Sequence, residues 1–186
     1  MPGLKDGDST ISKHPELPHN LHSLLGTIIR INPLGINSPN GKYGIPADNP
    51  FYSNPDPRVQ KEIWAYGFRK PHRLAWWDSP RGMKIVKVEV GENAVEEINL
   101  VEKGQDYGWN VREGDYAVSY NNMATPNPVP AGEAGAYVAP FAQYDRTDGN
   151  AISGGYVYEG LLKTLQDKYV FSDIIRGRLS WTLATA

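Results

Sequence analysis

The sequence predicts an all-β protein, and two features of its composition support that prediction. The chain has 19 glycines and 15 prolines among 186 residues, and they separate short runs rich in aromatic and β-branched residues. This punctuation is typical of many short strands joined by turns. Disorder would also enrich glycine and proline, but 5 Trp, 11 Tyr and 4 Phe argue against a disordered chain.

The expected strands begin after a polar entry segment, residues 1–20, and belong to one domain that spans residues 21–186. Each strand is a run of alternating or β-branched residues bounded by Gly, Pro, Asn or Asp. The predicted strands lie at 24–31, within 62–77 (two strands, broken at Gly67 and Pro71), and at 84–90, 97–101, 154–160, 167–173 and 177–183. The last three follow one another at the spacing of antiparallel neighbours in a sandwich, barrel or propeller blade.

Two long segments carry few strand signals. Residues 32–57 contain an Asn-Gly turn and many prolines, but Tyr43, Phe51 and Tyr52 favour an ordered loop. Residues 113–150 are expected to be mostly loop. No amphipathic helix of ten or more residues is recognisable, and residues 161–166 would form one helical turn at most.

The charge balance excludes several classes of function. The chain has 19 Lys+Arg and 21 Asp+Glu, a formal charge of -2, so a nucleic acid or another polyanion is not its expected partner. The absence of cysteine excludes a disulfide scaffold, a thiolate zinc site and a cysteine nucleophile. No apolar run approaches the roughly 18 residues that span a membrane, and residues 1–20 do not resemble a signal peptide.

Five stretches, in this order, resemble the glucose/sorbosone dehydrogenase family. Its members are soluble sugar dehydrogenases that use pyrroloquinoline quinone and fold as six-bladed β-propellers. The resemblance extends over roughly residues 20–183, which is nearly all of the chain. The stretches read LLGTIIRINPLG, NGKYGIPADNPF, EIWAYGFRKPHR, EEINLVEKGQDYGWNVREG, and GGYVYEG followed by KYVFSD.

The resemblance implies that this chain is a fragment of a propeller. Six blades of four antiparallel strands need roughly 240–270 residues, so 186 residues suffice for about three to four blades and leave the ring incomplete. The start of the family pattern, which carries the catalytic histidine, has no counterpart here. His14, His19, His22 and His72 lie in no catalytic motif, so we assign no catalytic base.

The resemblance also implies a cofactor site. Arg69 and Lys70 occupy the Gly-Phe-Arg-Lys-Pro turn, where the family places an arginine and an asparagine against the quinone. Arg176 lies where the family places a cation against a carboxylate of the cofactor. A guanidinium suits this flat tricarboxylate, because it can both stack on it and pair with a carboxylate. The alternatives are a basic turn on the propeller rim and a charged hairpin turn.

Calcium is the second implied cofactor. The family pattern assigns Glu97 and the main-chain carbonyl of Tyr107 to one calcium ion, and Glu113 and Asp115 could complete its shell of six to eight oxygens. A second calcium ion would use carbonyl groups near Gly91. The alternative is that Glu96 and Glu97 are solvated charges at a strand edge.

The resemblance thus implies an oxidoreductase that oxidises the C1 hydroxyl of an aldose to a lactone, with a sugar substrate and an electron acceptor as partners. The full-length protein would then be periplasmic or secreted. The alternative is a non-catalytic propeller that binds other molecules, as in the hedgehog-interacting group, whose GG(F/Y)VYxG and YVFxD motifs are also present here. Lys70, in place of asparagine, and Glu92, in place of proline, count against catalysis.

Overall fold

The computed structural model describes residues 16–118 and 127–183, and almost all regular structure in these ranges is β. The only helices there are two 3₁₀ turns, η1 (Leu17–His19) and η2 (Ala131–Glu133). The predicted all-β class is therefore confirmed. Most of the polar entry segment lies outside the described residues. Within the described ranges, no helix is long and apolar enough to cross a membrane.

The largest sheet has four antiparallel strands in the order β3-β4-β5-β8. Three of its strands come from one stretch of chain, and the fourth returns after a long excursion. The strands are β3 (Pro71–Ser79), β4 (Gly82–Glu89), β5 (Val95–Val101) and β8 (Ala142–Asp145). The fourth strand lies in a segment that the sequence predicts as loop. AQYD has no β-branched residue, and it becomes a strand because it pairs with β5, Ile98 opposite Ala142.

A second sheet has three antiparallel strands, ordered β9-β10-β11. Its strands are β9 (Ile152–Val157), β10 (Lys168–Asp173) and β11 (Arg178–Leu183). Residues in β10 alternate between half-buried and buried, as a strand with one core-facing side requires. β11 is an edge strand, and its Leu179, Trp181 and Leu183 are exposed.

Two small sheets complete the described fold. One pairs β1 (Ile28–Ile29) with β2 (Ile63–Ala65), and the other pairs β6 (Arg112–Glu113) with β7 (Tyr116–Ala117). The long loop between β1 and β2 is held to the fold by hydrogen bonds. Asn49 Nδ2 donates to the carbonyls of Arg30 (2.9 Å) and Lys61 (3.0 Å), which supports the prediction of an ordered loop.

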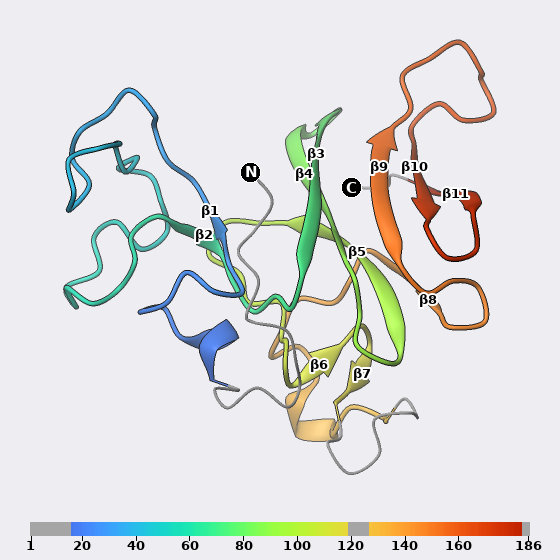
Figure 1. The fold of residues 1–186 in the computed structure, drawn as a ribbon, viewed down its shortest axis with the longest axis horizontal. Helices are drawn as coiled ribbons and strands as arrows, with labels where there is room; N and C mark the ends of the chain where they lie inside the picture. Colours follow the sequence, from blue (N-terminus) through green and yellow to red (C-terminus); the bar gives the residue numbers. More distant parts are fainter. Residues whose placement is uncertain (1–15, 119–126, 184–186) are drawn as a thin grey trace.

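In the four-stranded sheet, β5 and the second half of β4 are buried on both faces. One face packs against β9 and β10 through an apolar cluster that includes Val86, Val88, Ile98, Tyr169 and Phe171. The opposite face meets a second cluster, which contains Ile28, Ala65, Phe68, Val101 and Tyr107. In Figure 1 the β3–β4 hairpin stands between the β1–β2 pair and the β9–β11 sheet, so the sheets form neighbouring layers. Among the described residues one sheet has four strands, so a blade of the expected size is complete once.

Candidate functional site

Most of the predicted site residues gather at one end of the sheets. Because neighbouring strands are antiparallel, the start of β3, the end of β4 and the start of β5 lie together, and the β10–β11 turn lies at the same end. We call this the loop end. It is opposite the β3–β4 hairpin and lies toward the bottom of Figure 1. Arg69, Lys70, Gly91 and Arg176 all lie here.

Arg69 holds the loop between β4 and β5. Its buried guanidinium donates from Nη1 to the carbonyls of Val90 (3.1 Å) and Gly91 (3.4 Å) and forms an ion pair with Glu92. It also lies over the Trp109 ring, 5.5 Å from the centroid. The structure thus brings Arg69 and Gly91 together, and the arginine charge is balanced inside the chain by Glu92.

Gly91 allows the loop to fold this tightly. A Cβ atom at this position would lie 1.7 Å from the Val95 carbonyl oxygen and 2.6 Å from a carboxylate oxygen of Glu113. Neither approach is possible for a side chain, so the glycine is required by the close passage of the backbone.

Lys70 and Arg176 are the more accessible cations of the loop end. Lys70 is half-buried, and its backbone N–H donates to Glu89 Oε1 at 2.5 Å. Arg176 is exposed on the β10–β11 turn, which is fixed by its backbone N–H donating to Asp173 Oδ1 at 2.9 Å. Their assignment to the quinone stays a prediction, and their positions at the loop end are compatible with it.

Glu97 is buried, which excludes the alternative of a solvated charge. Its side chain is 7% exposed, Oε1 accepts the Gly114 N–H (2.6 Å), and Oε2 accepts an N–H of Asn99 (3.1 Å). The pKa of Glu97 is raised to about 7, first by burial and then by the neighbouring Glu89, while Lys87 and the hydrogen bonds from Asn99 and Gly114 act in the opposite direction.

The other residues predicted to bind calcium each make different contacts within the fold. Tyr107 packs in the second apolar cluster, its ring stacked 4.6 Å from that of Phe68, and its hydroxyl donates to the Leu100 carbonyl (2.6 Å). Glu113 accepts three backbone N–H groups of the β4–β5 loop, and Asp115 is exposed. The described residues contain no group of three His, Cys, Asp or Glu side chains placed to hold a metal.

Two buried or half-buried cations that the sequence interpretation missed organise these carboxylates. Arg146 pairs with Glu96 and lies 3.6 Å from Glu113, so it links the four-stranded sheet to the β4–β5 loop. Lys87 is completely buried and pairs with Glu89. Its only sequence signal is the alternation of Ile85, Lys87 and Glu89 on one face of a strand, which also describes a solvent-facing row.

The histidines do not form a catalytic constellation in the described chain. His19 Nδ1 lies 2.8 Å from Asp106 Oδ2, and His22 Nε2 lies 3.4 Å from Asp56 Oδ2. His72 is exposed, and His14 lies outside the described residues. These contacts fix the segment before β1 to later loops, and they identify no general base.

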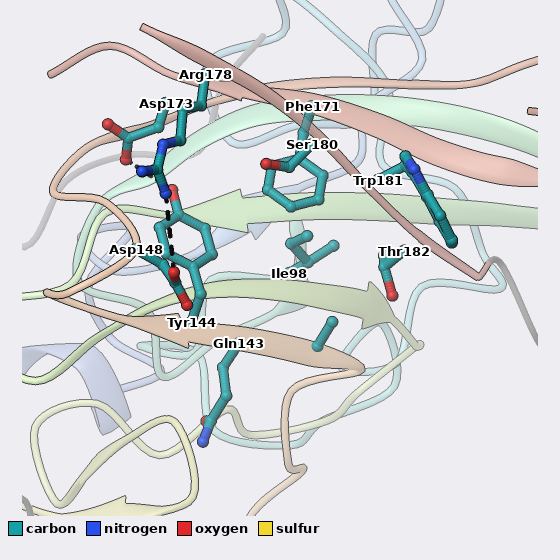
Figure 2. A pocket seen from close by; sticks show the side chains of 11 residues that line it. Ile98, Gln143, Tyr144, Asp148, Phe171, Asp173, Arg178, Ser180, Trp181 and Thr182 are labelled. Carbon is teal, nitrogen blue, oxygen red and sulfur yellow. Dashed lines mark hydrogen bonds and ion pairs between the residues drawn. The ribbon is translucent and has the colours of Figure 1, made fainter. Parts of the chain in front are cut away.

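A hollow of about 380 Å³ lies elsewhere, between β8 and the outer strand β11. Figure 2 shows Phe171 and Ile98 at its centre, Trp181 at one end, and at the other end Arg178 with Asp148, 3.9 Å apart. Ser180 and Thr182 also line it. None of the predicted site residues lines this hollow, although Asp173 and Arg178 at one end of it flank the β10–β11 turn of the loop end.

Comparison with known proteins identifies the family. The family model described as glucose/sorbosone dehydrogenase matches residues 6–179. The chain belongs to the glucose/sorbosone dehydrogenase family. Among curated members, it is 32% identical over 174 residues to the HIPL1 protein of Arabidopsis thaliana, covering 83% of this chain and 24% of that protein. It is 31% identical over 168 residues to quinoprotein glucose dehydrogenase B of Acinetobacter calcoaceticus, covering 86% and 32%.

Solved structures support the same fold. The PQQ-bound aldose sugar dehydrogenase of Streptomyces coelicolor matches with a TM-score of 0.60 at 21% identity, over 98% of this chain and 40% of that one. The apo form of the soluble aldose sugar dehydrogenase of Escherichia coli matches with a TM-score of 0.69 at 20% identity, over 99% and 47%. The predicted fold class, part of a β-propeller of this family, is confirmed. The chain spans about a quarter to a third of the length of the curated relatives it matches.

Proposed function

We propose that the chain is part of a quinone-dependent sugar dehydrogenase that oxidises the C1 hydroxyl of an aldose to a lactone. The observation that supports this most is the placement of Lys70 and Arg176 at one loop end, in a chain of the glucose/sorbosone dehydrogenase family. By resemblance to exported members, we also propose a periplasmic or secreted location for the full-length protein.

The side chains at the loop end fit pyrroloquinoline quinone in part. A tricarboxylate requires cations that it can reach, and Arg176 is exposed while Lys70 is half-buried. Arg69 fits less well, because its guanidinium is buried and already paired with Glu92. We therefore assign Arg176 and Lys70 to the cofactor carboxylates and Arg69 to the shape of the β4–β5 loop.

When bound, the quinone would accept the two electrons released as the sugar C1 hydroxyl becomes a lactone carbonyl. The residues of this chain would bind and orient it. The resemblance places the general base in a part of the family pattern without a counterpart here. We therefore expect this chain alone not to oxidise glucose with added quinone and calcium, since loss of a general base typically costs about 10²–10⁴-fold in rate.

Quinone titration followed by tryptophan fluorescence tests the proposal on the full-length protein that contains this chain. Arg176→Ala should weaken binding by about 10- to 100-fold, the cost of one charge-assisted hydrogen bond. Arg81→Ala, at the opposite hairpin end, is the matched control and should bind like the wild type. Lys70→Asn should weaken binding less than Arg176→Ala does, because the amide found in the family can still donate a hydrogen bond to a carboxylate. Equal affinities for the Arg176→Ala variant and the wild type would contradict the assignment.

A second candidate is a non-catalytic propeller that binds another molecule, and the Arg69–Glu92 ion pair favours it. An arginine neutralised within the chain contributes little to the recognition of an anionic cofactor. The same titration separates the two candidates, because a binding module of this kind would show no saturable quenching by the quinone.

A further inference from the structure

The face of the four-stranded sheet that meets Phe68 holds a buried charged cluster, which we call the Lys87 cluster: Lys87, Glu89, Glu97 and Asn99. These residues are cross-strand neighbours, because Lys87 lies opposite Asn99 and Glu89 opposite Glu97 in the β4–β5 ladder. Side chains opposite one another on one face lie about 5 Å apart at Cβ. The ladder alone therefore brings two carboxylates, an ammonium and an amide together.

The ammonium of Lys87 lies beside a buried carboxylate and an aromatic ring, both of which favour a cation. Lys87 is 0% exposed, its Nζ contacts Glu89 Oε2, and it lies 4.1 Å from the centroid of the Phe68 ring. Phe68 in turn stacks on Tyr107, the residue whose carbonyl is predicted to bind calcium. A buried ammonium is stable only when carboxylates or an aromatic face compensate for its lost hydration, and here both do.

The carboxylate oxygens of the cluster are already used by donors of the chain. Glu89 accepts the Lys70 N–H at Oε1 and the Lys87 ammonium at Oε2. Glu97 accepts the Gly114 N–H at Oε1 and the Asn99 amide at Oε2. Calcium requires six to eight oxygen ligands, with carboxylates turned toward the ion. The donor set as it is arranged here does not fit that requirement.

One oxygen of the cluster remains without a donor. Asn99 is 1% exposed, and among the described residues its Oδ1 accepts no hydrogen bond, although its amide nitrogen donates to Glu97. A buried amide oxygen of this kind is a ligand that a hard cation prefers. The cluster thus contains oxygen ligands of the kind that a cation site requires, and the Lys87 ammonium supplies its positive charge.

We propose that Lys87 supplies within the chain the positive charge that calcium was predicted to bring to Glu97, and that a divalent cation binds this cluster only when the lysine charge is removed. The site that was predicted to need calcium would then be stabilised by Lys87, without a metal ion. This inference concerns the stability of the chain and does not depend on quinone binding.

Isothermal titration of calcium chloride into the full chain, together with thermal melting in EDTA and in calcium, tests the proposal. The wild type should give no saturable heat, and its melting temperature should change by less than about 1 °C. Lys87→Gln should melt about 10 °C lower in EDTA, the expected cost of unpairing buried carboxylates, and regain several degrees in calcium. Lys84→Gln, on the other face of the same strand, is the matched control and should behave like the wild type.

Two results would overturn the proposal: a calcium heat in the wild type that Glu97→Gln abolishes, or Lys87→Gln that shows no response to calcium. If Lys87→Gln folds only when calcium is present, the proposal is supported. If it does not fold in either condition, the double variant Lys87→Met with Glu89→Gln decides, because it removes the ammonium together with the carboxylate that the ammonium contacts. That variant should fold and ignore calcium, and its failure to fold would show that the charge pairing is not what Lys87 provides.

Discussion

The two faces of β5 and of the second half of β4 are both buried, and they differ in chemistry. The face toward β9 and β10 is closed mainly by apolar contacts of Val86, Val88 and Ile98 with Tyr169 and Phe171. Its buried carboxylate, Glu96, lies at the edge of these contacts and pairs with Arg146 and the Ile152 N–H. The face toward Phe68 carries the Lys87 cluster, in which every charge depends on a particular neighbour. When a strand alternates apolar and charged residues, its charged face is usually expected to face solvent. Here the charged face is covered by another layer of the fold.

The sharpest way to test this difference is to remove one charge from the polar face. Lys87→Met should lower the free energy of unfolding by about 3–5 kcal/mol, because it leaves Glu89 buried without its cation. Adding Glu89→Gln to the same chain should recover most of the loss. Urea unfolding followed by tryptophan fluorescence measures both. A loss of less than about 1 kcal/mol in the single variant would mean that the polar face tolerates unpaired charge.

The matching change on the apolar face is Ile98→Ala. It removes buried methyl groups and leaves a cavity, at an expected cost of about 2–5 kcal/mol. Unlike Lys87→Met, it has no charge partner whose removal could restore the stability. Leu161→Ala, at a side chain that is 96% exposed, serves as the control and should change the stability by less than about 0.5 kcal/mol in the same urea experiment.

A smaller effect is expected in the loop that borders the polar face. Gly91→Ala should cost about 1–3 kcal/mol, because the new Cβ overlaps the Val95 carbonyl and forces the loop away from it. Gly132→Ala is the matched control, since a Cβ there meets no atom within 4 Å. Differential scanning fluorimetry of the two variants should separate them by several degrees. Equal melting temperatures would show that the loop can shift freely.

The smallest expected effect concerns a carboxylate outside the polar face. Burial disfavours ionisation of Asp173, but the N–H groups of Arg176, Ala151 and Asn150 and the Tyr144 hydroxyl outweigh it, so its pKa lies below the ordinary 3.8. A lowered folded pKa gives stability that is present above the unfolded pKa and lost as the pH falls through the folded value. Asp173→Asn should therefore cost about 1 kcal/mol at pH 7.

The same variant should lose less stability than the wild type as the pH is lowered from 5 to about 2. The urea concentration at the midpoint of unfolding, measured for both proteins across that pH range, gives the comparison. Parallel pH profiles for Asp173→Asn and the wild type would show that the hydrogen bonds to Asp173 contribute nothing to the acid sensitivity.

The sequence was sufficient for most of the longer strands, but not for β8 or for the way in which the strands pair. The alternation in residues 84–90 and the runs at 167–173 and 177–183 predict β4, β10 and β11, because a strand's period is local information. The strand β8 was missed because AQYD has no β-branched residue and pairs with β5, which is distant in the sequence.

The candidate site shows the same limit. The resemblance assigns Arg69 and Gly91 to cofactors, which stays a prediction; the structure places the two residues in contact, since both belong to turns at the same end of antiparallel strands. The pairing of Arg69 with Glu92 and of Arg146 with Glu96 depends on how separate segments pack. No local sequence pattern predicts either of these two ion pairs. Lys87 was missed for a related reason, because burial of its face is decided by Phe68 from another layer.

The Glu113 carboxylate has a consequence for the timing of motion in the β4–β5 loop. A single oxygen, Oε1, accepts the N–H groups of Asn93 (2.9 Å), Ala94 (2.8 Å) and Val95 (3.3 Å). Three amide protons are therefore protected from exchange with deuterium by one side chain, and they become exposed together when that side chain rotates away. The loop then opens as one unit, with a single rate constant shared by three successive residues.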